Sequence, residues 1–176
     1  MQRWRVPLGF LCAGVFLFFA RPTLWTLVIG GLLALPGLGL RAWGSGHLRK
    51  NDALATGGPY AYTRNPLYLG SFIMGLGFTI AAGRWFLAAV FVALFLGIYV
   101  PVMRVESATL TELFGKKYRR YAEAVPLFFP RPWAYQVSAA NKKFDAGLYK
   151  RYREYQAALG FAIAWALLAL KSYFFR

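Results

Sequence analysis

Five apolar runs, each close to the length of a membrane-spanning helix, constrain this chain more than any other feature of its sequence. A helix crosses the hydrocarbon layer of a bilayer with roughly 20 apolar residues, and 59% of the 176 residues are hydrophobic. The chain therefore has room for about five spans and little else. The sequence predicts an all-α integral membrane helical bundle, whose spans occupy about residues 6–20, 24–40, 67–83, 85–103 and 155–174.

The length is that of one domain, so we expect a single membrane domain over residues 1–176. Arg84 alone separates the third and fourth runs, which indicates a tight turn between antiparallel helices. Pro101 should kink the fourth span, and Gly115 should separate helices over 106–114 and 116–124. The domain then divides into two spans and a loop (1–56), the hairpin and the segment after it (57–131), and an interfacial helix leading to the fifth span (132–176).

The interfacial helix is predicted from the residues that follow position 141. Phe144, Leu148, Tyr152 and Tyr155 recur there at helical spacing, with basic residues among them. Aromatic and basic residues on one short helix are typical of a segment lying along the membrane surface.

Basic residues are unevenly distributed between the segments that join the runs. The chain holds 21 Lys and Arg against 6 Asp and Glu, and seventeen of the basic residues fall before the first run, in the 41–66 loop, or in the 104–154 segment. Basic residues collect on the cytoplasmic side of a membrane. We therefore expect the N-terminus and any active site in the cytoplasm, at a bacterial-type inner membrane. The same distribution makes the net charge of +15 a signal of topology, so no nucleic-acid partner is expected.

The sequence offers few residues for metal or transport chemistry. Its single cysteine, Cys12, lies in an apolar run, and its single histidine, His47, has no His or Cys neighbour. An ion path or proton relay would need ionisable side chains within the spans, which hold almost none. We expect no metal site and no transporter.

The most unusual stretch is the glycine-rich and proline-rich segment at residues 56–77. Glycine allows a backbone to approach a ligand closely, but it equally allows two helices to pack closely in a membrane. A soluble dinucleotide site would need its glycines in a turn between a strand and a helix. Gly75 and Gly77 lie in an apolar run instead, so that reading fails.

Several ordered motifs resemble the isoprenylcysteine carboxyl methyltransferase family, which belongs with the phospholipid N-methyltransferases. They are Gly58-Pro59-Tyr60, Arg64-Asn65-Pro66-Leu67-Tyr68-Leu69-Gly70, Glu106, Phe114-Gly115, Tyr118, Tyr121, Val125-Pro126 and Phe129-Pro130. The resemblance implies an integral membrane enzyme that binds S-adenosylmethionine from the cytoplasm, in the segment after the fourth span. A lipid or prenylated acceptor would arrive sideways from the bilayer, as for an isoprenylcysteine carboxyl O-methyltransferase.

The resemblance also implies the site residues. The cofactor-binding set is Tyr60, Arg64, Asn65, Pro66, Tyr68, Leu69, Gly75, Gly77, Glu106, Tyr118 and Tyr121. An amine or phenol acceptor must lose a proton, and Glu106 and Tyr68 are then the catalytic candidates. A carboxylate acceptor would need no base. An aromatic entrance for the acceptor is expected at Leu127, Phe128, Phe129 and Trp133.

Three positions depart from the family pattern. Asn65 stands where His is usual, which excludes a titratable ring. Ser107 replaces the second residue of a Glu-Glu pair, so an anionic contact to the cofactor would rest on Glu106. Leu127 replaces a frequent Arg and makes the expected entrance more apolar.

Three other functions stay open at this level. One is a phospholipid or phenolic-lipid methyltransferase. Another is an NADPH-dependent membrane reductase of the sterol reductase type, although such enzymes usually carry an acid where Ser71 follows Gly70. The third is a non-catalytic membrane scaffold. The sequence leaves the acceptor and the oligomeric state open.

Overall fold

The computed structural model describes residues 14–49, 53–136 and 143–174 of the chain. A short helix over residues 14–19 is followed by α2 (Leu24–Ser45), the 3₁₀ turn η2 (Gly58–Ala61), α3 (Pro66–Ala81), α4 (Trp85–Ala124), α5 (Ala146–Arg151) and α6 (Tyr155–Phe174). These described residues contain no strand. The predicted all-α membrane bundle is confirmed.

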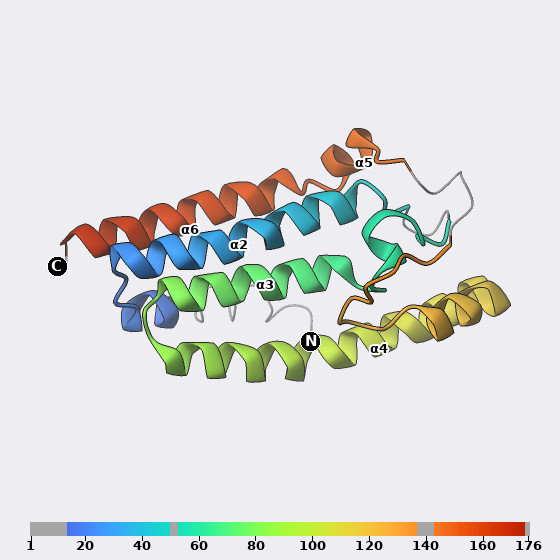
Figure 1. Ribbon diagram of the computed structural model, residues 1–176, viewed down its shortest axis with the longest axis horizontal. Helices are drawn as coiled ribbons and strands as arrows, with labels where there is room; N and C mark the ends of the chain where they lie inside the picture. The colour runs from blue at the N-terminus through green and yellow to red at the C-terminus, as the bar shows by residue number, and fades with distance from the viewer. Residues whose placement is uncertain (1–13, 50–52, 137–142, 175–176) are drawn as a thin grey trace.

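Three of these helices, α2, α4 and α6, are long and apolar enough to cross a membrane, and α3 is a shorter apolar helix. The four lie side by side in the order α6, α2, α3, α4 (Figure 1). Most of the first predicted span lies outside the described residues, so the count of five spans stays a prediction.

Glycine backbones bring α2 and α3 into direct contact. Each helix carries two glycines seven residues apart, and the antiparallel arrangement pairs Gly30 with Gly77 and Gly37 with Gly70. A Cβ atom added at Gly37 would lie 2.6 Å from the carbonyl oxygen of Gly70. We call these four residues the glycine seam; small residues of this kind let membrane helices approach closely.

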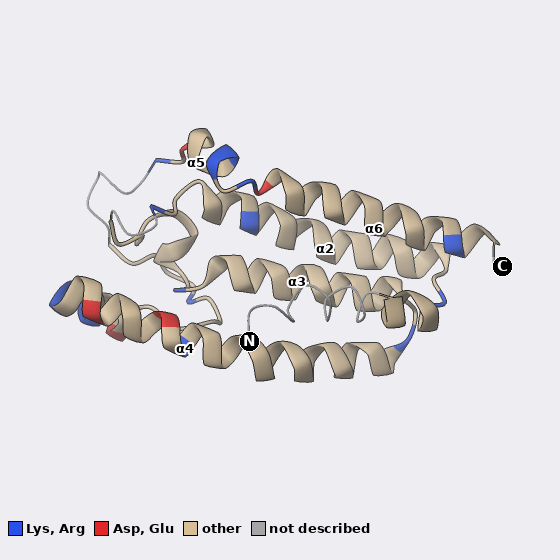
Figure 2. Ribbon diagram, turned by 180° about the vertical axis from the view of Figure 1, so that it is seen from behind, with Lys and Arg blue, Asp and Glu red and all other residues tan. Residues whose placement is uncertain are grey.

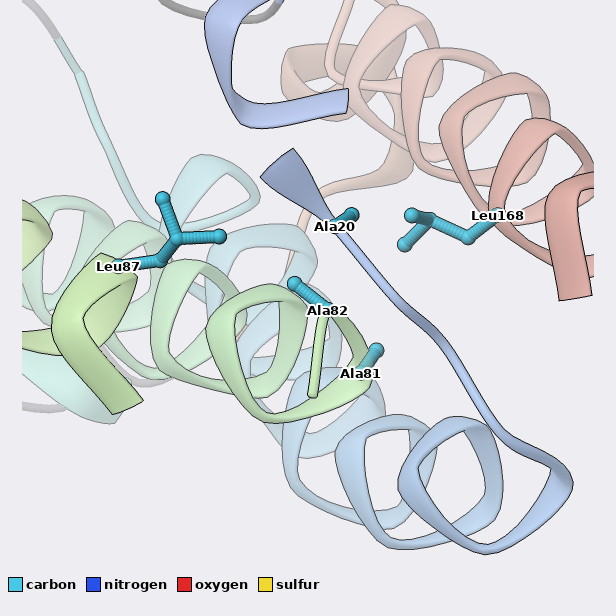
Figure 3. Close-up of a cluster of buried hydrophobic side chains, with 5 residues drawn as sticks. All are labelled: Ala20, Ala81, Ala82, Leu87 and Leu168. Atoms are coloured by element: carbon cyan, nitrogen blue, oxygen red, sulfur yellow. The ribbon is translucent and has the colours of Figure 1, made fainter. Parts of the chain in front are cut away.

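The predicted tight turn between the third and fourth runs is present. Gly83 takes a positive φ of 66° between α3 and α4, a conformation that glycine adopts at little cost. Beside the turn, apolar side chains from four segments form a buried cluster of Ala20, Ala81, Ala82, Leu87 and Leu168 (Figure 3). The backbone N–H of Arg21 donates to the carbonyl of Ala82 at 2.7 Å.

Two of the local predictions are resolved along α4. Pro101 lies inside this 40-residue helix, which continues through it, and only Gly115 leaves helical geometry, with φ 51° and ψ −126°. The expected separation at Gly115 is therefore confirmed. The helix ends at Ala124, two residues before Pro126, because proline cannot continue it.

The predicted interfacial helix is much shorter than expected. Within the described residues α5 covers only Ala146–Arg151, and Asp145 caps it by accepting a hydrogen bond from the N–H of Gly147. Phe144 lies before the helix, with its ring 6.1 Å from that of His47. Arg153 has a left-handed φ of 53°, which separates α5 from α6. The helical spacing of the aromatic residues was therefore misleading.

Charge separates the two ends of the bundle. Acidic and basic residues gather where α3 begins and α4 finishes, whereas the end with the α3–α4 turn shows a few basic positions (Figure 2). The glycine-rich loop, the second half of α4 and the residues after it all meet at the charged end. That end is where the candidate site must be sought.

Candidate functional site

The loop before α3 is fastened to the proline-rich segment after α4 by backbone hydrogen bonds. The N–H of Arg64 donates to the carbonyl of Pro126 at 3.0 Å, and the N–H of Arg131 donates to the carbonyl of Tyr62 at 3.0 Å. The hydroxyl of Thr63 donates to the carbonyl of Phe128 at 2.8 Å. Two motifs about sixty residues apart in the sequence therefore form one structural unit.

Asn65 contributes to the same fastening. It stands at the start of α3, where its side chain makes no capping hydrogen bond. Its amide nitrogen instead donates to the carbonyl of Leu127 at 2.9 Å. This contact gives the residue that replaces the usual His a direct role in holding the segment after α4.

Arg64 points from the loop to α4. Its Nη1 donates to Ser107 Oγ at 3.1 Å and to the Tyr118 hydroxyl at 3.3 Å, and these two oxygens are 2.6 Å apart. Its Nε is buried and has no hydrogen-bond partner. A buried guanidinium nitrogen without a partner has unused capacity to donate to an anionic group.

Tyr68 and Glu106 make a second connection between α3 and α4. The Tyr68 hydroxyl donates to a Glu106 carboxylate oxygen at 2.8 Å, and Glu106 itself is exposed. The Tyr68 ring also lies against Tyr99 on α4, with ring centroids 5.2 Å apart. We call Arg64, Tyr68, Glu106, Ser107 and Tyr118 the polar cluster.

Two buried tyrosines lie beneath the polar cluster. The Tyr121 hydroxyl donates to the carbonyl of Tyr60 at 2.7 Å. Burial raises the pKa of the Tyr60 phenol, and the negative charges of Glu106 and Glu154 raise it further. Burial likewise raises the pKa of Tyr121 above its ordinary value. Both phenols therefore stay protonated well into the alkaline range.

The remaining predicted cofactor residues lie in packing positions. Gly77 belongs to the glycine seam, and a Cβ atom at Gly75 would collide with the ring of Phe91. Leu69 is buried with Phe95, Met103 and Phe128. Pro66 is buried at the first turn of α3. For these residues the structure shows helix packing.

The predicted entrance residues divide into buried and exposed positions. Phe128 packs in the core beside Leu69 and Phe95, so it does not lie on an exposed entrance. Phe129 is 70% exposed and Trp133 is 66% exposed; we call these two residues the aromatic rim. Leu127 is half-buried, so its exposure is intermediate between that of Phe128 and that of the aromatic rim.

Sequence reasoning missed a polar group on the opposite side of α3. Arg41 on α2 forms an ion pair with Glu154, with an Nη2 to Oε1 distance of 2.7 Å. Its Nη1 donates to Ser71 Oγ. The sequence offered one signal for this group: Arg41 directly follows the apolar, glycine-containing run at 24–40.

Two surface hollows lie beside other residues. One of about 810 Å³ is at the end with the α3–α4 turn, next to Arg21, Trp25 and Lys171. One of about 340 Å³ lies between Trp43, η2 and residues 134–136. Neither is lined by Glu106 or Tyr68. Across the part of the chain that the structure describes, no three His, Cys, Asp or Glu residues could hold a metal ion.

A comparison with protein families matches residues 31–117 to the phospholipid methyltransferase family. The cobalt-zinc-cadmium resistance protein CzcN of Cupriavidus metallidurans is 33% identical over 138 residues, which cover 73% of this chain and 62% of that protein. The protein-S-isoprenylcysteine O-methyltransferase of Schizosaccharomyces pombe is 33% identical over 81 residues, 46% of this chain and 34% of that enzyme.

The nickel-cobalt-cadmium resistance protein NccN of Alcaligenes xylosoxydans is 36% identical over 83 residues, 47% of this chain and 38% of that protein. The chain therefore covers less than two thirds of each of these relatives. No solved structure matches the chain significantly. The resemblance drawn from the motifs is confirmed at the level of the family.

Proposed function

We propose that this chain, whose residues 31–117 match the phospholipid methyltransferase family, transfers a methyl group from S-adenosylmethionine to a lipid-soluble acceptor. The observation that supports the proposal most directly is the polar cluster. There the loop motif supplies Arg64 and α4 supplies Ser107 and Tyr118, with hydrogen bonds joining all three. The family match covers Arg64, Tyr68, Glu106 and Ser107.

The side chains present fit such a cofactor chemically. S-adenosylmethionine carries a carboxylate, an ammonium, ribose hydroxyls and a sulfonium. Arg64, with its unpartnered Nε, would hold the carboxylate, because charge-assisted bonds from guanidinium to carboxylate are strong. Glu106 would accept hydrogen bonds from the ammonium or the hydroxyls, and the nearby tyrosine rings would face the cationic part. When bound, the cofactor supplies an electrophilic methyl group.

The residues of the chain would act mainly by holding and shielding the reactants. Positioning alone can supply roughly 7–11 kcal/mol of barrier reduction. Tyr68 fixes one oxygen of Glu106 by donating to it, which leaves the other oxygen for a ligand. If the acceptor is an amine or a phenol, Glu106 takes its proton; a carboxylate acceptor requires no proton transfer.

We place the acceptor path at the aromatic rim and the charged end in the cytoplasm. Trp favours the depth where lipid meets water, and Phe129 and Trp133 lie exposed on the segment after α4 that the loop holds. The S. pombe relative is a protein-S-isoprenylcysteine O-methyltransferase, so a prenylated carboxylate is our first acceptor. Amine phospholipids and phenolic lipids are the next acceptors to try.

Ligand-induced stabilisation of the purified protein tests the proposal. S-adenosylmethionine and S-adenosylhomocysteine should each raise the free energy of unfolding, by about 2.7 kcal/mol at 100 times the dissociation constant. NADPH serves as the control ligand. A shift with NADPH and none with the other two would favour a reductase and contradict the proposal. Transfer of a labelled methyl group to a panel of lipid extracts would then identify the acceptor.

A further inference from the structure

The inference concerns Arg41, which joins three helices at the charged end. Nη2 lies 2.7 Å and 3.0 Å from the two carboxylate oxygens of Glu154, at the start of α6. Nη1 contacts the Ser71 hydroxyl and the carbonyl of Leu67, both on α3. The side chains of Arg41 and Glu154 are only 21% and 12% exposed. Figure 2 shows the basic position on α2 beside the acidic position at the start of α6.

Gly70 makes room for this arrangement. A Cβ atom at Gly70 would lie 2.7 Å from Cγ of Arg41, closer than side-chain carbons approach. The stem of Arg41 therefore crosses α3 in a notch that only glycine leaves open. This gives a physical reason for the glycine that ends the Arg64–Gly70 motif, which the polar cluster does not explain.

Arg41 and the polar cluster contact the same turns of α3 from opposite sides. Leu67 and Ser71, which Arg41 contacts, flank Tyr68, which contacts Glu106 on α4. Two carboxylates thus lie on either side of the start of α3. Both charges act on the buried phenol of Tyr60. Burial is the main cause that raises the pKa of this phenol, and the two carboxylates raise it further. The Arg41 side of α3 is the side that faces α2 and α6.

Elsewhere α6 is attached through its middle and far end, where the rings of Phe161 and Trp165 lie beside Phe78 and the ammonium of Lys171 donates to the carbonyls of Leu17 and Phe18. Leu168 is its one buried residue among those described, and it lies near the far end of the helix. At the charged end the chain reaches α6 through the short α5 and the left-handed Arg153. The ion pair is the one salt bridge within residues 14–49, 53–136 and 143–174. Glu154 also falls outside the family match, whereas Arg41 and Ser71 fall inside it.

We propose that Arg41 is a positioning residue for the methyl acceptor: it fixes Glu154 and the start of α6 against α3, as the wall of the site on the side that faces α2 and α6. The cofactor side is the polar cluster between α3 and α4, so Arg41 acts on acceptor affinity and leaves cofactor affinity unchanged. The inference rests on the proposed function. Arginine suits this role because its planar fork holds its donors apart in fixed directions, toward Glu154 on one side and Ser71 on the other, whereas a lysine ammonium concentrates its three donors on one atom at the end of a flexible stem.

The test compares Arg41→Lys and Glu154→Gln with the matched surface variants Arg104→Lys and Glu112→Gln, all in nanodiscs. Arg104 and Glu112 are exposed on α4. Hydrogen exchange of residues 146–158 should quicken in the first pair and stay unchanged in the second. The dissociation constant of S-adenosylhomocysteine should stay within the error of the parent value in all four.

The kinetic measurement uses a farnesylated cysteine and phosphatidylethanolamine vesicles as acceptors. For the acceptor that the parent methylates, the Michaelis constant should rise about tenfold in Arg41→Lys, which corresponds to 1.4 kcal/mol, with little change in kcat. The double variant Arg41→Lys with Glu154→Gln should have the same Michaelis constant as Arg41→Lys alone, because the two residues act as one unit.

Three results would overturn the inference. They are unchanged exchange at 146–158, an equal loss of S-adenosylhomocysteine affinity, and a loss in kcat with an unaltered Michaelis constant. If the parent protein is active, any of these results refutes the role of Arg41 and leaves the proposed function standing. A parent that binds no S-adenosylhomocysteine and transfers no methyl group refutes the proposed function itself, and the acceptor role of Arg41 with it.

Discussion

The glycine seam and the polar cluster hold α3 in two different ways. At the seam, Gly30 and Gly37 of α2 meet Gly77 and Gly70 of α3 through their backbones, and no side chain separates the helices. In the polar cluster, α3 and its preceding loop meet α4 through side chains that donate and accept hydrogen bonds. The seam should therefore fail when an atom is added, and the cluster when a polar atom is removed.

The largest effect is expected from adding volume at the seam. Gly37→Leu places a side chain where even a Cβ atom would lie 2.6 Å from the Gly70 carbonyl oxygen. Overpacking costs about 1–3 kcal/mol where side chains can shift, and a backbone neighbour cannot shift without separating the helices. We expect little folded protein, measured as monodisperse yield in detergent.

Gly39→Leu is the matched control for this variant. Gly39 is exposed on the same helix, and nothing lies within 4 Å of its added Cβ atom. It should fold like the parent. Equal yields of the two variants would show that close backbone contact does not hold α2 to α3.

The next effect is on turnover at constant fold. Glu106→Gln keeps the shape of the side chain and removes the charge that the cofactor would meet. A hydrogen bond to a charged group contributes about 1.5–3 kcal/mol, so activity or S-adenosylmethionine affinity should fall about ten- to a hundredfold. The melting temperature should stay near that of the parent, because Glu106 is exposed.

Glu112→Gln, at another exposed position of α4, controls for the loss of one surface charge. Calorimetric titration and labelled-methyl transfer would measure the two variants together. If Glu106→Gln turned over like Glu112→Gln, Glu106 would be only surface charge and the site would have to lie elsewhere.

The two regions also differ in how far the sequence predicted them. Apolar runs predicted α2, α4 and α6 because a bilayer requires a minimum apolar length. The turn at Gly83 followed from a single polar residue between two runs. The interfacial helix was predicted too long: α5 covers only Ala146–Arg151, because helical spacing says nothing about tertiary contacts, and Phe144 lies against His47.

The site was predicted mainly through the resemblance. It named Arg64, Tyr68 and Glu106, but the hydrogen bond of Arg64 to Ser107 depends on how the loop before α3 lies against α4. Glu154 could not be predicted, since it meets Arg41 across 113 residues of sequence. The glycine seam could be predicted only in part. The sequence shows glycines seven residues apart in both α2 and α3, but only the fold shows that the two pairs face each other.

A smaller effect is expected beneath the polar cluster. Tyr121→Phe removes the hydroxyl that donates to the buried Tyr60 carbonyl, which should cost about 1 kcal/mol. The raised pKa of Tyr121 also gives a pH signature. The folded protein keeps this proton after the unfolded chain loses it near pH 10, so the phenol stabilises the fold below about pH 10 and this contribution is lost as the pH rises further.

Thermal unfolding between about pH 8 and pH 11 would measure both effects. Tyr121→Phe should melt below the parent at pH 8 and lose less stability than the parent as the pH increases. Tyr173→Phe, at an exposed tyrosine of α6, should follow the parent throughout. An unchanged alkaline slope in Tyr121→Phe would mean that Tyr121 does not titrate differently in the folded state.

The smallest effect is expected at the aromatic rim, which belongs to neither mode of holding α3. Phe129 and Trp133 are largely exposed, and the Arg131 guanidinium lies over the Trp133 ring, 5.6 Å from its centre. Such a cation–π contact contributes about 0.5–1 kcal/mol at an exposed site. The double variant Phe129→Ala with Trp133→Ala should thus fold normally, while the Michaelis constant of a lipid acceptor rises a few fold and S-adenosylmethionine affinity stays constant. Trp85→Ala, 83% exposed at the other end of the bundle, controls for lost anchoring in the membrane. An equal rise with Trp85→Ala would reduce the rim to an anchor, and a matching loss of cofactor affinity would place Phe129 and Trp133 beside the polar cluster in function.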